Sequence, residues 1–129
     1  MRENCILSNL KDVVLLKIPY PTEDSGLNRV AHMYICIKVE NEQVYYAKCQ
    51  SYEPYHAKKG SLPKYRVIEP ADESRNPFKR KTIVDLDKLF VTDKNRILNK
   101  IGEVSELLLD EILHEVDTMK NGEIEMVRL

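Results

Sequence analysis

Short runs of β-branched, aliphatic and aromatic residues, separated by polar or proline-containing segments, follow one another along most of this 129-residue chain. The run from Val13 to Ile18 ends at Pro19-Tyr20-Pro21, and prolines cannot continue a strand ladder, so we predict a first strand there. The polar segment Thr22–Asn28 then reads as a loop. The runs His32–Glu40 and Val44–Ser51 are rich in β-forming residues and predict a β-hairpin with a four-residue connection, residues 40–43.

The segment Thr82–Val104 carries the most specific pattern of the chain. Its β-branched start runs into alternating apolar and charged residues up to Val91. A turn at Thr92–Lys94 and a second apolar group within residues 97–101 follow. We therefore expect a strand here that bends toward a closing helix. In the preceding proline-rich stretch, the run Tyr65–Ile68 is one plausible further strand.

The last predicted element is a helix from Glu106 to Met119. Ser105 is a suitable N-cap, and Val104 and Leu109 occupy the two positions of a hydrophobic staple. Asn121-Gly122 supplies a stop signal. One face of this helix is apolar and is expected to pack on the sheet or on a partner subunit. The pattern as a whole predicts a single domain over residues 1–129, mainly β with a C-terminal α-helix.

Composition narrows the classes of protein that the chain can belong to. Its length suits one domain with one core. No apolar run reaches the roughly 20 residues that cross a bilayer, and Met1–Leu10 lacks the pattern of a secretory leader. We therefore expect a soluble cytoplasmic protein that does not contact membranes. Cys5, Cys36 and Cys49 are odd in number and widely spaced, so neither a disulfide framework nor a zinc site is expected, and no cofactor is predicted.

Charge is unevenly distributed although the formal net charge is only −1. Basic residues outnumber acidic ones over residues 51–100, most densely from Lys58 to Lys81, and the reverse holds over residues 101–129. Tyrosines interleave with the basic residues, a mixture that holds single-stranded nucleic acid by stacking and phosphate contacts. The alternative is that the tyrosine rings pack on the protein and the charges are only solvated. The candidate RNA-binding residues are Tyr52, Tyr55, Lys58, Lys59, Arg66, Lys79 and Arg80.

Several short motifs, taken in order, resemble the MazF/PemK family of toxin endoribonucleases. They are Asp12 with the aliphatic run after it, Pro19-Tyr20-Pro21, Asn28-Arg29-Val30-Ala31, the Thr-Asp-Lys-x-Arg run at 92–96, and Lys100-Ile101-Gly102. The resemblance implies a strongly bent, SH3-like β-barrel that forms a homodimer. It also implies cleavage of single-stranded mRNA without metal, and neutralisation by a small antitoxin protein. This chain lacks the family's proline before Ala31 and its usual threonine near residue 51.

The resemblance and the chemistry of RNA cleavage together indicate candidate catalytic residues. Arg29 matches the family's arginine and could pair with a phosphate through two parallel hydrogen bonds. Ser51, or Gln50 beside it, takes the place of the family's threonine. His32 and His56 are possible acid/base residues, because imidazole transfers protons near neutral pH, although a lone histidine is more often structural. Two other classes remain open, a CcdB-like barrel that poisons gyrase by binding and a plain SH3-like interaction module.

Overall fold

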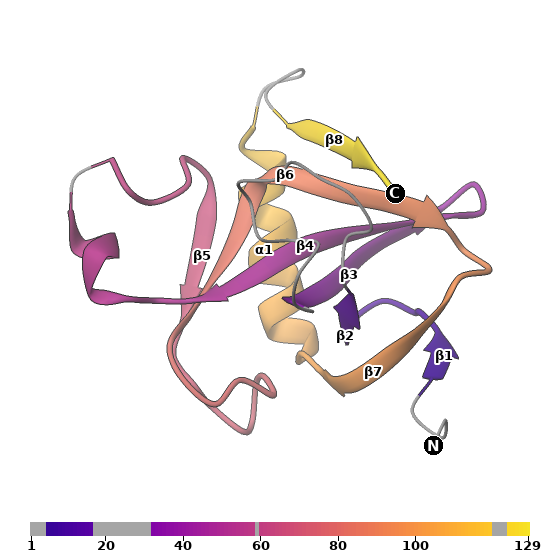
Figure 1. Ribbon diagram of the computed structural model, residues 1–129, viewed down its shortest axis with the longest axis horizontal. Coiled ribbons are helices and arrows are strands. Elements are labelled where there is room, and N and C mark those ends of the chain that lie inside the picture. The colour runs from indigo at the N-terminus through magenta and orange to yellow at the C-terminus, as the bar shows by residue number, and fades with distance from the viewer. Residues whose placement is uncertain (1–4, 17–31, 59, 120–123) are drawn as a thin grey trace.

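The computed structural model describes residues 5–16, 32–58, 60–119 and 124–129 (Figure 1). Within these ranges the chain forms one sheet, one α-helix and one short 3₁₀ helix. In chain order the elements are β1 (Cys5–Leu7), β2 (Asp12–Leu16), β3 (His32–Glu40), β4 (Gln43–Ser51), η1 (Pro54–Ala57), β5 (Arg66–Glu69), β6 (Thr82–Asp93), β7 (Ile97–Glu103), α1 (Glu106–Asp117) and β8 (Glu125–Arg128).

The predicted hairpin is confirmed, with a tighter turn than expected. Gln43 pairs with Glu40, so only Asn41 and Glu42 connect β3 to β4. Both connecting residues have left-handed backbones, with φ of 53° and 66°. Two successive positive φ values match the right-handed twist of paired strands and favour a two-residue connection. The hairpin fixes the start of β3 opposite the end of β4, where the candidate site lies.

Strand β6 pairs with three other strands. It pairs with β4 along its length, and its other edge pairs with β5 near its start and with β8 near its end. All pairings are antiparallel except that of β8 with β6. The register against β4 jumps from Lys48–Asp85 to Ala47–Leu89, leaving the intervening residues of β6 as a bulge. The carboxylate of Asp87 in this bulge accepts backbone N–H groups of residues 64 and 65, at 2.8 and 2.7 Å. Such bulges bend and twist a strand.

The strand order is β1-β7-β2-β3-β4-β6-β5, with β8 also on β6. The second apolar group of the sequence thus forms β7, which leaves β6 and pairs with β2 and β1 on the far side of the sheet (Figure 1). The fold is mainly β with one α-helix after the long strands, as predicted. Among the described strands, no ladder joins the β1 edge to the β5 and β8 edge. The sheet is therefore bent but not closed.

Both faces of the sheet are apolar, because alternate residues of β3 point to opposite sides. Ile35 and Ile37 belong to a cluster that includes the apolar face of α1, whereas Tyr34 and Cys36 belong to a second cluster on the opposite face. In Figure 1 the helix lies across the face of the β3–β4–β6 strands. The second cluster contains Val14, Leu16, Tyr34, Cys36, Val44, Tyr46, Phe90 and Leu98.

Helix α1 begins at Glu106 as predicted, and the Ser105 hydroxyl accepts the N–H of Leu108 at 3.1 Å. The helix ends at Asp117 instead of Met119, with Thr118 as its C-cap. The expected stop at Asn121-Gly122 lies outside the described residues. The sequence predicted that this helix is the last element of the chain. That prediction is wrong, because β8 follows the helix and pairs in parallel with β6.

The remaining strand predictions hold to within a few residues. The strand expected from Tyr65 is β5, shifted by one residue to Arg66–Glu69. The first predicted strand corresponds to β2, and the predicted residues beyond Leu16, like the loop Thr22–Asn28, lie outside the described residues. Strand β1 was not predicted from the sequence. Its three residues pair with β7, and a run that short carries no readable alternation.

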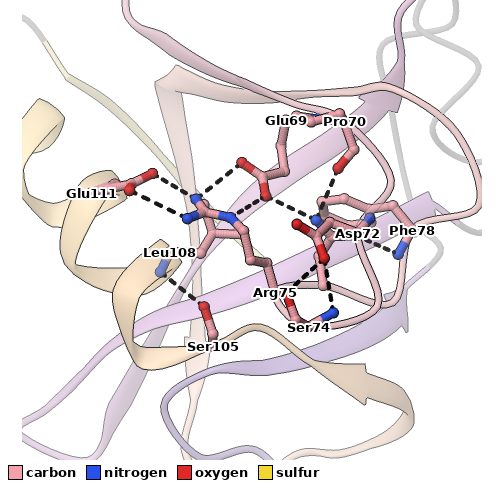
Figure 2. A network of polar contacts seen from close by, with 10 residues as sticks. Glu69, Pro70, Asp72, Ser74, Arg75, Phe78, Ser105, Leu108 and Glu111 are labelled. Atoms are coloured by element: carbon pink, nitrogen blue, oxygen red, sulfur yellow. Dashed lines mark hydrogen bonds and ion pairs between the residues drawn. The ribbon is translucent and has the colours of Figure 1, made fainter.

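A partly buried ion-pair network anchors the segment between β5 and β6 to α1 (Figure 2). The Arg75 guanidinium donates to Glu69 at 2.7 and 3.2 Å and to Glu111 of α1 at 2.6 Å. The side-chain amide of Asn76 donates to Glu69 at 2.9 Å and its oxygen accepts the N–H of Phe78 at 3.0 Å. The Glu69 side chain is only 4% exposed. The network fixes the course of the chain that leads to the basic residues at 79–81.

Candidate functional site

A pocket of about 360 Å³ opens where β3 begins and β4 ends. The strand register sets Met33 directly opposite Cys49, so residues just before and just after this pair gather at one end of the hairpin. Polar and apolar side chains both contribute to the pocket wall. Its lining residues are His32, Met33, Cys49, Gln50, Ser51, Glu53 and Tyr55.

The pocket brings together several of the residues that the sequence indicated. Ser51 and its alternative Gln50 both line it, and so does His32. Ser51 also pairs with Thr82, the first residue of β6. Arg29, the other predicted catalytic residue, lies outside the described residues. Ser51, Gln50 and His32 therefore all border one cavity.

His56 lies beside this pocket, where its side chain is buried and held by neighbouring groups. Its ring is 3% exposed, and its Nδ1 accepts the backbone N–H of Glu53 at 2.8 Å. A neutral imidazole that accepts at Nδ1 carries its proton on Nε2. The ring also contacts the rings of Tyr52 and Tyr55, with centroids 5.5 and 4.0 Å away. These contacts order η1 and the pocket wall. The acid/base role of His56 stays a prediction, and His32 has the better position for it.

A tyrosine and a lysine form a stacked pair next to the pocket. The Lys81 ammonium lies 4.1 Å from the centroid of the Tyr52 ring, a cation–π distance, and the N–H of Tyr52 donates to the Lys81 carbonyl at 2.9 Å. Arg80 reaches Glu53 at 3.4 Å. Lys81 lay within the basic segment that the sequence indicated but was not singled out, because its proximity to Tyr52 depends on the pairing of β4 with β6.

The other predicted RNA-binding residues divide into two groups. Tyr55 is exposed, as are Lys58 and Lys79, and Tyr55 lines the pocket. Arg66 is also exposed, but it donates to the carbonyl of Pro63 at 2.8 Å and lies on β5, two strands away from Ser51. Lys59 lies outside the described residues.

An ionisable pair that the sequence did not reveal lies on the same sheet face as Gln50 and His32. Lys48 and Asp85 are directly paired across β4 and β6, and both are partly buried. Burial lowers the pKa of Lys48 and raises the pKa of Asp85. Each shift favours the uncharged form of its group. Sequence gave no signal for this pair, because only the β6 bulge sets the register that joins them.

Two further lining residues, Glu53 and Cys49, have distinct chemistry. Glu53 precedes Pro54 at the start of η1, and the sequence signal for it was the acidic residue before a helix-starting proline. Cys49 is 2% exposed and burial raises the pKa of its thiol. Since the thiolate is the nucleophilic form, Cys49 is an inert wall residue at neutral pH.

Within the described ranges, no three His, Cys, Asp or Glu side chains converge in a way that could hold a metal ion. The same part of the chain contains no helix with the length and apolar character to cross a membrane. Comparison with known proteins adds no assignment, since no protein-family model matches the chain and no curated protein matches its sequence.

Proposed function

We propose that this protein is a metal-independent endoribonuclease that cleaves single-stranded RNA at the pocket between β3 and β4, and that it acts as a toxin of the MazF/PemK kind. The observation that carries the proposal is the meeting of Ser51, Gln50 and His32 in one pocket, beside the stacked pair of Tyr52 and Lys81. Polar residues that could assist phosphoryl transfer thus lie next to an aromatic ring and an ammonium group that could bind single-stranded RNA.

The chemistry requires little of the protein. The 2′-hydroxyl of one nucleotide loses its proton and its oxygen bonds to the adjacent phosphorus. The bond from phosphorus to the 5′-oxygen breaks, and that oxygen takes up a proton, leaving a 2′,3′-cyclic phosphate and a free 5′-hydroxyl. In this proposal His32 transfers protons, and the Ser51 hydroxyl and the Arg29 guanidinium donate to the phosphate oxygens as negative charge accumulates. Arg29 precedes His32 by three positions in the sequence.

The test is cleavage of a synthetic single-stranded RNA in the presence of EDTA, with analysis of the product ends. Wild type should release cyclic-phosphate and 5′-hydroxyl ends. Ser51→Ala and Arg29→Ala should each lower kcat by about 100-fold or more, the scale of one lost oxyanion contact. Ser74→Ala is the matched control, because that serine is exposed and bonds only locally to Asp72.

Activity that requires added magnesium, or product ends of the opposite polarity, would contradict this mechanism. Absence of cleavage by a folded wild-type protein on RNAs of all sequences would favour the binding classes, a gyrase poison or an interaction module. Growth arrest on expression, relieved by a co-expressed small acidic protein, would support the toxin role. The homodimer and the antitoxin stay predictions.

We also infer that the bent sheet corresponds to an SH3-like barrel. The pairing of β6 with two different strands on one edge and the irregular registers of β2 with β7 and of β3 with β4 support strong curvature. Protection of backbone amides along β1 and β5, measured by hydrogen exchange, tests whether these edges are paired. Fast exchange of the outward-facing amides at both edges is expected for a barrel that is open at this seam, and protection at both edges would contradict that geometry.

A further inference from the structure

The pocket lining has the chemistry of a nucleobase site. Its lining residues include Glu53, Gln50 and Ser51 together with the apolar Met33. None of the described residues that line it is a lysine or an arginine, although Arg80 approaches a carboxylate oxygen of Glu53 at 3.4 Å. The scissile phosphate of the proposed function lies at the Ser51 and His32 end of the pocket, because a phosphate next to Glu53 would face a carboxylate of like charge. A neutral, planar base would not.

The acceptor and donor set matches one base better than the others. Guanine presents two neighbouring donors, N1–H and N2–H, beside the acceptor O6. A carboxylate accepts two parallel N–H bonds, and charge-assisted bonds of this kind are about twice as strong as neutral ones. The side-chain amide of Gln50 can donate to O6. Adenine, cytosine and uracil each offer the carboxylate only one such donor group.

The pocket wall is also ordered before any ligand binds. The backbone of Glu53 is fixed by its N–H bond to His56 at 2.8 Å and by the proline that follows it. Tyr55 is 56% exposed, while one side of its ring packs on His56. An exposed, supported aromatic face at the rim of a pocket is suited to stack on a base. The buried His56 is then a positioning residue for both Glu53 and Tyr55.

We propose that this pocket binds a guanine base of a single-stranded nucleic acid, with Glu53 accepting N1–H and N2–H and Tyr55 stacking on the ring. The proposal rests on the strand-binding part of the proposed function, and not on cleavage. It makes Glu53 the residue that determines which base is preferred.

The test uses 2′-deoxy pentanucleotides, which lack the attacking hydroxyl and cannot be cleaved by the proposed chemistry. Four thymines flank a central guanine or, in the second probe, a central hypoxanthine, which lacks only the N2 amino group. Fluorescence anisotropy with wild type should show about tenfold tighter binding of the guanine strand, the scale of one lost partner in a bidentate contact. Glu53→Gln should abolish that ratio, and Glu73→Gln, an exposed glutamate outside the pocket lining, should preserve it.

Equal binding of the two probes by wild type would overturn the proposal, and so would a ratio that survives in Glu53→Gln. Preference for a central adenine or cytosine over guanine would overturn the assignment of the base. The comparison of the two probes with wild type does not depend on whether any variant folds. A guanine preference without cleavage of any RNA refutes the proposed function and leaves this inference intact. Cleavage of RNA without any guanine preference refutes this inference and leaves the proposed function intact.

Discussion

Removing Arg75 should destabilise the protein more than removing any exposed arginine. The guanidinium makes two bonds to Glu69, at 2.7 and 3.2 Å, and two to Glu111, at 2.6 and 3.4 Å. Arg75→Met keeps the apolar stem and removes all four. The buried Glu69 carboxylate is then left with Asn76 as its remaining charge-assisted partner among the described residues.

The size of the effect follows from the exposure of each partner. Glu69 is 4% exposed, and a bond to a buried charged group is worth about 1.5–3 kcal/mol. Glu111 is 47% exposed, so its pair with Arg75 adds only about 0–1 kcal/mol. The guanidinium is itself 22% exposed, which places the sum near the low end of the ~3–5 kcal/mol expected for a broken buried pair. We expect about 3 kcal/mol, or a Tm lower by about 10 °C.

Urea unfolding followed by circular dichroism measures this loss at pH 7. The control is Arg80→Met, since Arg80 is 62% exposed and makes one contact of 3.4 Å to Glu53; it should cost about 0–1 kcal/mol. Glu69→Gln combined with Arg75→Met should cost about 1.5 kcal/mol less than the sum of the single changes, because no unpaired charge remains buried. Additive single effects, or equal losses in Arg75→Met and Arg80→Met, would refute the reasoning.

Three further outcomes are expected. In a variant without Cys5, the thiols of Cys36 and Cys49 should resist a thiol reagent at pH 8 until urea unfolds the protein, because both are buried and burial raises the pKa of Cys36 to about 12; fast labelling of the native protein would contradict this. Burial raises the pKa of Tyr46 to about 12, above its ordinary value near 10. The contribution of the neutral Tyr46 to the free energy of unfolding is therefore complete below pH 10 and should fall as pH rises from 10 to 12, by about 3 kcal/mol at most. A urea midpoint that is flat over this interval would contradict that assignment. Gly102→Ala should destabilise the protein by about 1–3 kcal/mol, since its Cβ would lie 2.6 Å from a proline ring carbon; an unchanged Tm would show that the two backbones move apart freely.

Local signals determined much of the secondary structure. The β-branched and aromatic runs predicted β3 and β4 at nearly their observed limits, because side-chain period and turn chemistry act over a few residues. Ser105 predicted the start of α1, since a helix N-cap is satisfied within one turn. Strands β1 and β8 were missed, because short segments become strands only when a longer neighbour supplies hydrogen-bond partners.

The site was determined only in part by the sequence. Ser51 and His32 were indicated as candidates, and their meeting in one pocket follows from the hairpin register. The pairing of Tyr52 with Lys81 and of Lys48 with Asp85 depends on β4 lying against β6. No local pattern encodes that contact, because the residues are about 30 or more positions apart and a bulge sets their register. The sequence thus indicated which chemical groups are candidates, and only the long-range strand pairing decided which of them share a surface. The physical reason is that backbone hydrogen bonds between distant strands fix side-chain positions that no local propensity can specify.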